Sequence, residues 1–485
     1  MGKDYIPQLN RDNFCFDTNI VHLIPVQAAR RLKAFPMFKV NKKLVVALTE
    51  PENLEKLDEL SKITSLDISP VKVDEQDFTD FLNEVYLEIE FNDDSFKKRL
   101  SSSSAIEVLD GLLEEAISRR ASDIHIELLE SQISIRFRID GEMTISGAYP
   151  YSIHEEVISR IKLISGMDIS EKRLPQEGKF VWDANGSEID LRVVTLPTIR
   201  GESAVIRILD SKNIKRRLNS LGFEDDFLKR YRELINKNQG LILICGPTGS
   251  GKTTTLYTTI QELKLDKKKI VAIEDPCEYQ LDKITQIEVD KDIGLDYESG
   301  LKAILRGDPD VILIGEIRNS ETARIALEAA LTGHLVFATL HTTTCISAIY
   351  RLLEMKLPAY MIADSLLLII NQRLVRKLCL NCHQKREISE INKEKIKEVG
   401  LDISKIFIPN GCRKCDNKGY RGRTLIFEAL VINEYLKKSI LLGINDNIGI
   451  DFDKLEYISM EHVASEKIEN GIISLSDTLS YLKET

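Results

Sequence analysis

The sequence of 485 residues has no apolar run long enough to cross a membrane, which takes about 18 consecutive apolar residues. The longest apolar stretch, around 365–370, is far shorter. The first residues, Met1 to Tyr5, are not followed by the apolar segment that a secretory signal peptide contains. These absences argue against an integral membrane protein and a secreted one. We expect the chain to stay in the cytosol unless a partner recruits it to a membrane.

The chain also lacks an excess of basic residues. It has 66 lysines and arginines against 76 aspartates and glutamates, which gives a formal net charge of −10. Proteins that move along nucleic acids usually carry a basic track, so this balance argues against such a motor, and we expect no nucleic-acid partner. The hydrophobic share of 43% is ordinary for a globular protein. The length predicts roughly two to four domains.

Cysteines are few, eight in all, and fall into two groups. Four are scattered, as expected for small apolar side chains in a reducing cytosol: Cys15, Cys245, Cys277 and Cys345. The other four form two C-x₂-C pairs: Cys379 with Cys382, and Cys412 with Cys415. Two such pairs supply the four thiolates of a closed tetrahedral site, so we predict structural Zn²⁺. An iron–sulfur cluster is the alternative, and a disulfide pair is less favoured in the cytosol.

Residues 246–253 form a complete phosphate-binding loop: Gly246, Pro247, Thr248, Gly249, Ser250, Gly251, Lys252 and Thr253. An apolar run at 241–245 precedes the loop and predicts a strand, and the residues from Thr254 to Ile260 predict a helix. This is the context that the G-x-x-x-x-G-K-[ST] motif requires. We therefore predict that a nucleoside triphosphate binds here, with Lys252 on its β- and γ-phosphates and Thr253 holding Mg²⁺. We include Thr254 in the predicted nucleotide site.

Charged or polar residues mark three further strand ends, where an open α/β sheet binds its ligand. The groups are Glu274-Asp275-Pro276 with Glu278, then Asp308-Pro309-Asp310 and Gly315-Glu316 around the strand 311–314, and finally Thr332-Gly333-His334 with His341. Glu316 is the predicted activator of the attacking water, with a structural salt bridge as the alternative. For Glu278 and His334 a structural role stays equally open.

The sequence offers further candidate ligands for Mg²⁺ and candidate arginines to supply positive charge at the site. Gly315 stands where many such ATPases carry a metal-holding aspartate, which leaves Mg²⁺ to Thr253, to waters and to Glu274 or Asp275. Hydrolysis also needs positive charge on the transferring phosphoryl group. Candidate arginines are Arg306, just before the second group, and Arg192 and Arg207, on alternating strands of the preceding part of the chain. For the last two, a solvated strand face is the alternative.

The order of predicted elements indicates an α/β protein in several parts. We expect a small α/β unit over 1–88, a polar linker over 89–104 and a mixed α/β module over 105–212. Strands alternate with helices over 220–430, which predicts a parallel sheet, and the cysteine-rich segment 379–415 is inserted there. After residue 426 the chain is expected to be mainly helical, including the segment 431–485.

Several motifs together resemble one family over about residues 105–428, the assembly ATPases of type II secretion (general secretion pathway protein E) and type IV pili. They are Ala121–Glu127, Arg136–Gly141, Arg173–Lys179, the phosphate loop, the Glu274-Asp275-Pro276 box, Gly315–Arg318, and the histidines His334 and His341. The resemblance implies a RecA-like P-loop ATPase domain after a PAS-like module and a small N-terminal domain. Its cofactors would be ATP, Mg²⁺ and Zn²⁺.

The resemblance also implies site residues. Arg192, Arg207 and Arg306 fall on family arginines expected to touch nucleotide, and His341 joins the nucleotide site. A further family arginine is expected near 302, where this chain has Lys302. Lysine keeps the charge but loses the bidentate fork, so the role of that position stays open. The four paired cysteines match the zinc subdomain of the family.

By the same resemblance, the chain is expected to be a homo-hexameric motor that powers pseudopilus assembly in type II protein secretion. It would work at the cytoplasmic face of the inner membrane, and would be membrane-associated through partners only. Residues 1–88 would dock on the cytoplasmic part of an inner-membrane secretion platform protein. Pilus extension or a competence-type ATPase is the alternative, and a DNA-translocating motor is less favoured.

Overall fold

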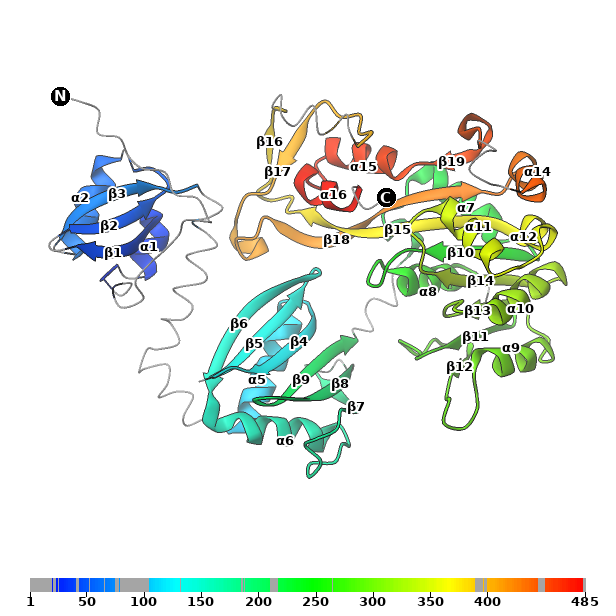
Figure 1. Cartoon of the computed structure of the whole chain (residues 1–485), viewed down its shortest axis with the longest axis horizontal. Coiled ribbons are helices and arrows are strands. Elements are labelled where there is room, and N and C mark those ends of the chain that lie inside the picture. The colour runs from blue at the N-terminus through cyan, green and yellow to red at the C-terminus, as the bar shows by residue number, and fades with distance from the viewer. Residues whose placement is uncertain are drawn as a thin grey trace. The chain divides into compact units, whose positions relative to one another are not determined.

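The computed structural model describes residues 26–40, 43–74 (apart from 52 and 65), 104–209 (apart from 131, 185 and 187), 217–388 (apart from 264), 399–443 and 450–482, with the single residues 20, 23, 24, 78 and 396. The chain divides into two compact units. Figure 1 labels their helices and strands. The first unit comprises Met1–Gly186 and Leu191–Ile208, and the second comprises Ser187–Asp190 and Leu209–Thr485. The finer domain boundaries named above stay predictions.

A three-stranded sheet in the order β1-β2-β3 opens the described chain. Its elements are α1 (Val26–Leu32), β1 (Ala34–Val40), β2 (Lys43–Leu48), α2 (Leu54–Thr64) and β3 (Asp67–Lys72). The apolar run 44–48 predicts a strand and the apolar spacing from Leu54 to Ile63 predicts a helix, and β2 and α2 confirm both. The sequence also predicts a helix over 77–87. That segment and the linker predicted over 89–104 lie outside the described residues, apart from residues 78 and 104.

A six-stranded sheet in the order β6-β5-β4-β9-β8-β7 follows in the first unit. Its elements are α5 (Ala105–Ser118), β4 (Ala121–Leu128), β5 (Gln132–Ile139), β6 (Glu142–Pro150), α6 (His154–Ile164), β7 (Gln176–Asp183), β8 (Glu188–Thr198) and β9 (Gly201–Leu209). Apolar and polar residues alternate in β4 and β5, and the apolar ones are buried. This period-two pattern in the sequence predicts a pair of half-buried strands, and the structure confirms the pair.

The second unit is built on an eight-stranded sheet in the order β12-β11-β13-β14-β10-β15-β18-β19. Its strands are β10 (Gly240–Cys245), β11 (Ile270–Glu274), β12 (Thr285–Glu288), β13 (Val311–Ile314), β14 (Leu335–Leu340), β15 (Leu366–Leu378), β18 (Tyr420–Val431) and β19 (Glu456–Ile458). The first six strands in the sheet order are parallel, as predicted, and β18 and β19 add antiparallel pairs.

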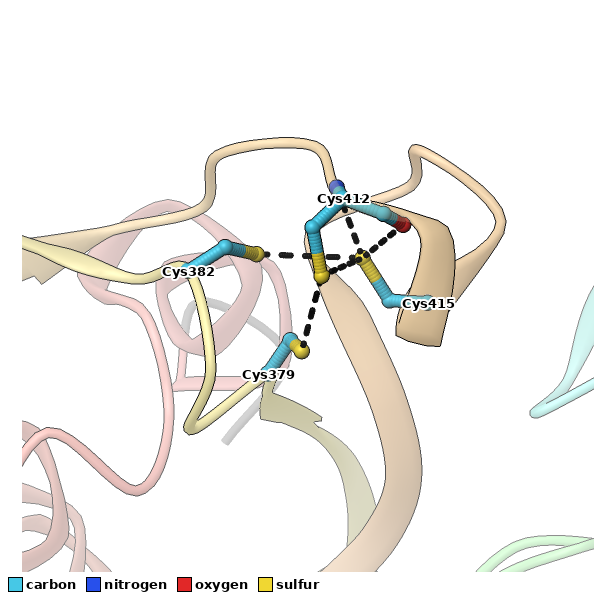
Figure 2. A group of neighbouring side chains, drawn as sticks. All are labelled: Cys379, Cys382, Cys412 and Cys415. Atoms are coloured by element: carbon cyan, nitrogen blue, oxygen red, sulfur yellow. Dashed lines mark hydrogen bonds between the residues drawn. The ribbon is translucent and has the colours of Figure 1, made fainter.

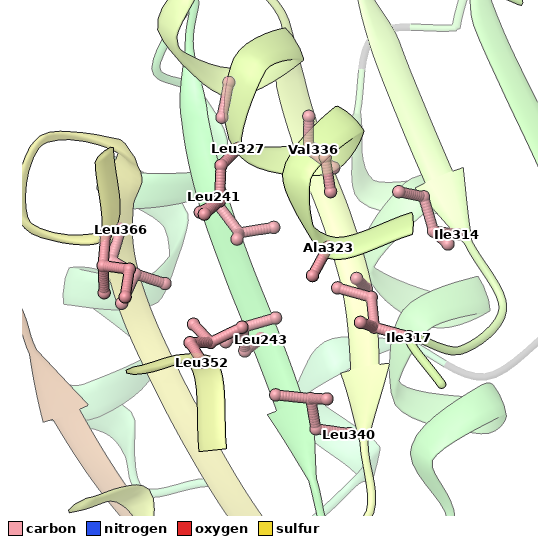
Figure 3. Close-up of a cluster of buried hydrophobic side chains, with 14 of the residues drawn as sticks. Leu241, Leu243, Ile314, Ile317, Ala323, Leu327, Val336, Leu340, Leu352 and Leu366 are labelled. Carbon is pink, nitrogen blue, oxygen red and sulfur yellow. The ribbon is translucent and has the colours of Figure 1, made fainter. Parts of the chain in front are cut away.

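Helices cover both faces of this sheet. They are α7 (Asp225–Ile235), α8 (Lys252–Glu262), α9 (Tyr297–Leu305), α10 (Ser320–Leu331), α11 (Cys345–Glu354), α12 (Ala359–Ser365), α14 (Glu434–Leu442), α15 (Met460–Glu469) and α16 (Leu475–Leu482). Leu241 and Leu243 of β10 face the core formed with α9 to α12 and α14 (Figure 3), while Ile242 and Ile244 face the core formed with α7 and α8. Both faces are apolar, so β10 is a continuous hydrophobic run, as a doubly covered parallel strand requires.

The C-terminal part is mainly helical after residue 426, as predicted, because it contains α14, α15 and α16. Two strand segments were not predicted there: β18 continues to Val431, and the short strand β19 follows at Glu456–Ile458. Strands β15 and β18 pair antiparallel from Leu368↔Val431 to Leu378↔Tyr420, as a long hairpin interrupted by the cysteine-rich segment. The two strands are separated by that segment, so the sequence carries no short turn signal that reveals their pairing. No described helix is long and apolar enough to span a bilayer.

An ion pair fixes α16 against this hairpin. The Arg376 guanidinium on β15 donates to Asp477 from Nη2 at 2.7 Å and from Nε at 3.1 Å, and also stacks 4.1 Å above the Tyr420 ring. The Asp477 side chain is only 9% exposed. Removing one partner of a buried pair leaves a charge without its counter-ion, which costs more than losing an exposed pair.

We expect Asp477→Ala to lower the melting temperature by about 5 °C, since breaking a buried ion pair costs about 3 kcal/mol. The matched control is Lys229→Ala, which breaks the exposed pair with Asp226 at 2.9 Å and should shift the melting temperature by less than about 1 °C. Differential scanning calorimetry measures both. Equal shifts in the two variants would show that the Arg376 pair does not anchor α16.

Candidate nucleotide-binding site and cysteine cluster

The phosphate loop connects β10 to α8 and adopts a backbone that its glycines make possible. Gly246, Gly249 and Gly251 have φ of 140°, 79° and 87°, in the region that favours glycine. Gly246 and Ser250 are buried, whereas the tip at 247–249 is exposed. Helix α8 begins at Lys252 directly after the loop, so its first N–H groups and its dipole add to an anion site there.

Space around the loop admits no side chain at its first position. A Cβ on Gly246 would lie 2.6 Å from the Gln372 carbonyl oxygen and 2.6 Å from Ser250 Oγ. Ser250 Oγ is itself buried and has no hydrogen-bond partner among the described residues. A buried polar atom without a partner is costly, and a phosphate oxygen would supply one. The residues present therefore fit a bound phosphate chain.

Lys252 lies within the loop rather than in solvent. Its ammonium group donates to the carbonyl oxygens of Gly246 and Pro247, each at 2.9 Å. The residue is 9% exposed, and burial lowers the pKa of Lys252. The charge is thus held at the loop by backbone carbonyls, next to the position that a β- or γ-phosphate takes in the motif.

Glu316 follows β13 and faces the same edge of the sheet. Its carboxylate is ion-paired with the guanidinium of Arg318, and its Oε2 lies 3.5 Å from Nε2 of His341. Burial, together with the positive charge of Lys252, lowers the pKa of His341 and favours the neutral ring. Strand β14, which carries His341 at its end, lies between β13 and β10. The structure therefore places Glu316, His341 and the phosphate loop at three neighbouring strand ends.

The acidic box at the end of β11 completes this edge. Glu274 is buried and accepts hydrogen bonds from the Tyr257 hydroxyl at 2.7 Å and from Gln286 Nε2 at 3.3 Å, and burial raises the pKa of Glu274. Asp275 lies 3.6 Å from Lys291 and 3.7 Å from Arg318. Tyr257 lies on α8, so Glu274 is tied directly to the helix that follows the phosphate loop.

The space beside Gly315 is tight for any side chain. A Cβ there would lie 3.0 Å from the Tyr297 hydroxyl, 3.2 Å from Cα of Glu274 and 3.3 Å from the Ile273 carbonyl oxygen. Two of these neighbours are backbone atoms, which do not move aside. Magnesium ligands must therefore come from elsewhere, in keeping with Thr253 and the acidic box as candidates.

Two groups expected at the ligand edge lie at the other edge of the sheet. Asp310 precedes β13 and accepts from the backbone N–H of Lys269, which precedes β11, at 2.7 Å. His334 precedes β14, and its Nδ1 lies 3.0 Å from the Ala329 carbonyl oxygen at the end of α10. Residues before a parallel strand lie at its amino end, and ligands bind at the carboxyl end. The placement of His334 and 308–310 with the other strand ends was wrong.

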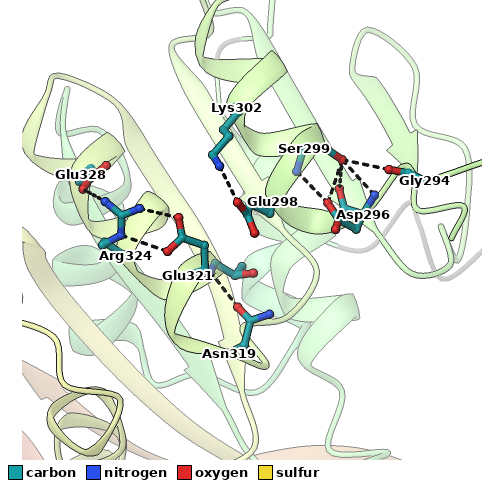
Figure 4. A network of polar contacts seen from close by, with 10 residues as sticks. Gly294, Asp296, Glu298, Ser299, Lys302, Asn319, Glu321, Arg324 and Glu328 are labelled. Atoms are coloured by element: carbon teal, nitrogen blue, oxygen red, sulfur yellow. Dashed lines mark hydrogen bonds and ion pairs between the residues drawn. The ribbon is translucent and has the colours of Figure 1, made fainter.

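The arginine and lysine candidates of the second unit lie on α9. Arg306 is the exposed C-cap residue of α9. Lys302 lies one turn earlier and pairs with Glu298 at 2.5 Å, beside a second network in which Arg324 binds Glu321 and Glu328 (Figure 4). Lys302 is thus engaged within its own helix, and its contact with nucleotide stays a prediction.

Arg192 and Arg207 belong to the sheet of the first unit. Nε of Arg207 donates to Asp123 Oδ1 at 2.9 Å, and the Arg207 side chain is 62% exposed. Arg192 lies between the buried residues Leu191 and Val193 of β8, so it is on the opposite face of the sheet from them. Strands β8 and β9 are neighbours. Their contribution to a nucleotide site stays a prediction.

Two functional candidates were missed at the sequence level, Tyr257 and Gln372. Gln372 is fully buried in β15 and bonds to the phosphate loop, 122 residues away from Ser250 in the sequence. A single signal was present, because Asn371-Gln372-Arg373 interrupts an otherwise apolar run with three polar residues. The parallel pairing of β15 with β10 is what brings these polar residues next to the phosphate loop, and the sequence does not show that pairing.

The four paired cysteines come together at the end of the β15–β18 hairpin (Figure 2). The Sγ–Sγ distances are 3.8 Å for Cys379–Cys412, 3.7 Å for Cys382–Cys415 and 3.7 Å for Cys412–Cys415. A tetrahedral site with Zn–S of about 2.3 Å places its sulfurs about 3.8 Å apart, whereas disulfide sulfurs are about 2 Å apart. The backbone N–H of Gly419 donates to Cys415 Sγ at 3.2 Å, as expected around a thiolate ligand. The cluster therefore fits Zn²⁺.

Comparison with known proteins decides the family. The type II/IV secretion system protein family matches residues 98–480, and an MshEN domain matches 6–90. The chain belongs to the type II/IV secretion system protein family. The family assignment made from the motifs is confirmed.

Curated relatives cover most of the chain. The type IV pilus assembly ATPase PilB of Myxococcus xanthus is 35% identical over 471 residues, which are 91% of this chain and 83% of that protein. The type II secretion system ATPase E of Vibrio cholerae is 39% identical over 380 residues, 78% of this chain and 76% of that protein. These family members are secretion and pilus ATPases.

Solved structures support the α/β fold. The pilus retraction motor PilT, solved with bound ADP, matches with a TM-score of 0.52 and 27% identity over 76% of this chain and 95% of that one. The ATPase DotB of Legionella pneumophila matches with a TM-score of 0.59 over 79% of this chain and 97% of that one, at 22% identity, which shows the fold alone. The predicted fold class is confirmed.

We expect the purified protein to contain about one zinc per chain, because the four sulfurs have the spacing of a tetrahedral site. Cys415→Ser should lose the metal, while Cys277→Ser, outside the cluster, should retain it. Inductively coupled plasma mass spectrometry measures zinc and iron together. Iron in place of zinc, or zinc retained by Cys415→Ser, would contradict the assignment.

Proposed function

We propose that this chain is an ATP-hydrolysing motor that drives assembly of a pseudopilus in type II secretion. The observation that carries the proposal is the arrangement of Lys252 in its loop, His341 and Glu316 at three adjacent carboxyl ends of parallel strands. This edge provides an anion site and a carboxylate close enough to influence each other electrostatically. Phosphoryl transfer requires both of these elements.

Each residue has a distinct proposed role. The loop amides and Lys252 bind the β- and γ-phosphates, and the Thr253 hydroxyl holds Mg²⁺ with Glu274 or Asp275 nearby. ATP supplies the phosphoryl group. Glu316 accepts a proton from the attacking water, and the neutral ring of His341 orients the Glu316 carboxylate from 3.5 Å. Arg318 pairs with both Glu316 and Asp275, which keeps the acidic side chains in fixed positions.

Assembly and location follow from family membership as further parts of the proposal. A homo-hexamer would let Arg192 and Arg207 of one subunit serve the phosphate loop of the next, with Arg306 as an additional donor of positive charge. Residues 1–88 would bind the cytoplasmic part of an inner-membrane platform protein. Zn²⁺ at the cysteine cluster would stabilise the end of the β15–β18 hairpin and take no part in hydrolysis, because four thiolates leave no open coordination position.

Pilus extension is the second candidate function. The relative named PilB aligns with 91% of this chain, against 78% for the Vibrio secretion ATPase, although identity to the latter is higher. A chromosomal Lys252→Ala replacement separates the two. Loss of secreted enzymes with pili retained supports secretion, and loss of surface pili with secretion retained supports pilus extension.

We expect Lys252→Ala to abolish ATP turnover and Glu316→Gln to lower it at least about a hundredfold while ATP binding persists, since only the second variant keeps the anion site. Glu328→Gln, an exposed carboxylate of α10, is the control and should keep wild-type turnover. Phosphate release and equilibrium binding of a fluorescent ATP analogue measure the two steps. Wild-type turnover in either site variant would end the ATPase assignment.

We expect specific ATPase activity to rise with protein concentration as subunits associate, because a separate chain lacks the arginines of its neighbour. Sedimentation velocity across the same concentrations gives the oligomeric state. Arg207→Ala should reduce turnover about a hundredfold without dissociating the oligomer. Full activity of a dilute monomer would rule out arginines supplied between subunits.

A further inference from the structure

Strand β15 contains a buried polar segment that the proposed roles above do not use. Asn371, Gln372 and Arg373 are 0%, 0% and 3% exposed, between apolar residues on both sides. Burying polar side chains in a central strand is costly unless each one finds hydrogen-bond partners. Their partners therefore show what the segment holds in place.

Gln372 contacts the phosphate loop at both ends. Its Nε2 donates to the Ser250 carbonyl oxygen at 2.8 Å, and its Oε1 accepts from the Thr255 hydroxyl at 3.0 Å. Its own carbonyl oxygen is the atom that a Cβ on Gly246 would approach to 2.6 Å. The backbone oxygen of Gln372 thus leaves no space for a side chain at the start of the loop. Its side chain bonds to the end of the loop and to the first turn of α8.

Asn371 performs a similar task on the opposite face of the strand. Its Nδ2 donates to the Thr343 carbonyl oxygen and lies 3.3 Å from Glu428 Oε2, and its Oδ1 accepts from Arg373 Nη1 at 3.0 Å. Thr343 lies in the loop between His341 and α11. Two adjacent residues of β15 therefore hold two different loops of the nucleotide edge.

We propose that Gln372 is the positioning residue of the phosphate loop, which sets the loop's backbone for nucleotide through its paired hydrogen bonds to Ser250 and Thr255. The inference rests on the proposed ATP-binding function of that loop. We assign Gln372 no direct contact with substrate, because both polar atoms of its side chain are hydrogen-bonded, one to the loop and one to α8. It acts by fixing the direction of the peptide groups that meet the phosphates.

Two variants test the paired bonds, and a third is their control. Gln372→Met keeps the volume and removes both side-chain bonds, and Thr255→Val removes the bond to Oε1. Thr259→Val makes the same substitution one turn further along α8, where the hydroxyl donates to the Thr255 carbonyl oxygen at 2.7 Å and bonds to Tyr231 at 2.7 Å. Among the described residues, Thr259 has no hydrogen bond to the side chain of Gln372. Thr255 and Thr259 are 1% and 0% exposed, so burial is matched.

We expect Gln372→Met to raise the Kd for ATP about tenfold and Thr255→Val about threefold, in line with the loss of two and one hydrogen bonds. The double variant should have the same Kd for ATP as Gln372→Met, since both substitutions act through the side chain of Gln372. Thr259→Val should lower the melting temperature and leave the Kd unchanged. Titration with a fluorescent ATP analogue and calorimetry supply the readings.

Three results would overturn the inference: an unchanged Kd in Gln372→Met, additive losses in the double variant, or an equal rise of Kd in Thr259→Val. If Gln372→Met does not fold, Thr255→Val against Thr259→Val decides the question alone. Failure of the wild-type protein to bind ATP would instead defeat the proposed function, so the two failures are distinguishable.

Discussion

The close approach between Gly246 and the carbonyl oxygen of Gln372 is the constraint on which the rest of the nucleotide edge depends. The loop can pass this point only without a side chain, because a Cβ would come within 2.6 Å of a backbone oxygen that cannot move aside. The contact exists because β10 and β15 are parallel neighbours, with Cys245 opposite Asn371. The register of β10 against β15 therefore sets the position of the start of the loop. The loop in turn sets the position of Lys252, at which α8 begins.

The same strand connects this edge to the cysteine cluster. β15 extends from Leu366 through Gln372 to Leu378, and Cys379, the first residue of the cysteine cluster, follows directly. β18 returns from the cluster beside it as far as Val431. A metal bound at the cluster would limit how far the two strands of the hairpin can separate. The cysteine cluster and the phosphate loop thus adjoin the same strand, β15.

Short motifs in the sequence were enough to predict the phosphate loop, its flanking strand and helix, and the grouping of the four paired cysteines. Each of these depends on residues close together in the chain, where glycine conformations, helix starts and ligand spacing are directly visible. Gln372 could not be predicted, since its partners lie 122 and 117 residues away and become neighbours only through strand order. His334 was misplaced for a related reason. Whether a residue precedes or follows a parallel strand decides whether it lies at the amino or the carboxyl end of the sheet. In the sequence, the histidine before β14 is as plausible a functional residue as the histidine after it.

The cations at the nucleotide edge of the second unit are already engaged by groups of that unit. Lys252, Lys291, Arg318 and Arg373 contribute positive charge there, and the carboxylates are those of Glu274, Asp275 and Glu316. Arg318 is already paired with Glu316 and Asp275, and Lys252 is hydrogen-bonded to loop carbonyls. A triphosphate adds negative charge to an edge where Arg373 too is hydrogen-bonded, to Asn371 and to the Gln372 carbonyl oxygen. Charge that develops on the transferring group must be neutralised, and this is the physical reason for our proposal that Mg²⁺ and arginines from another module or subunit complete the site.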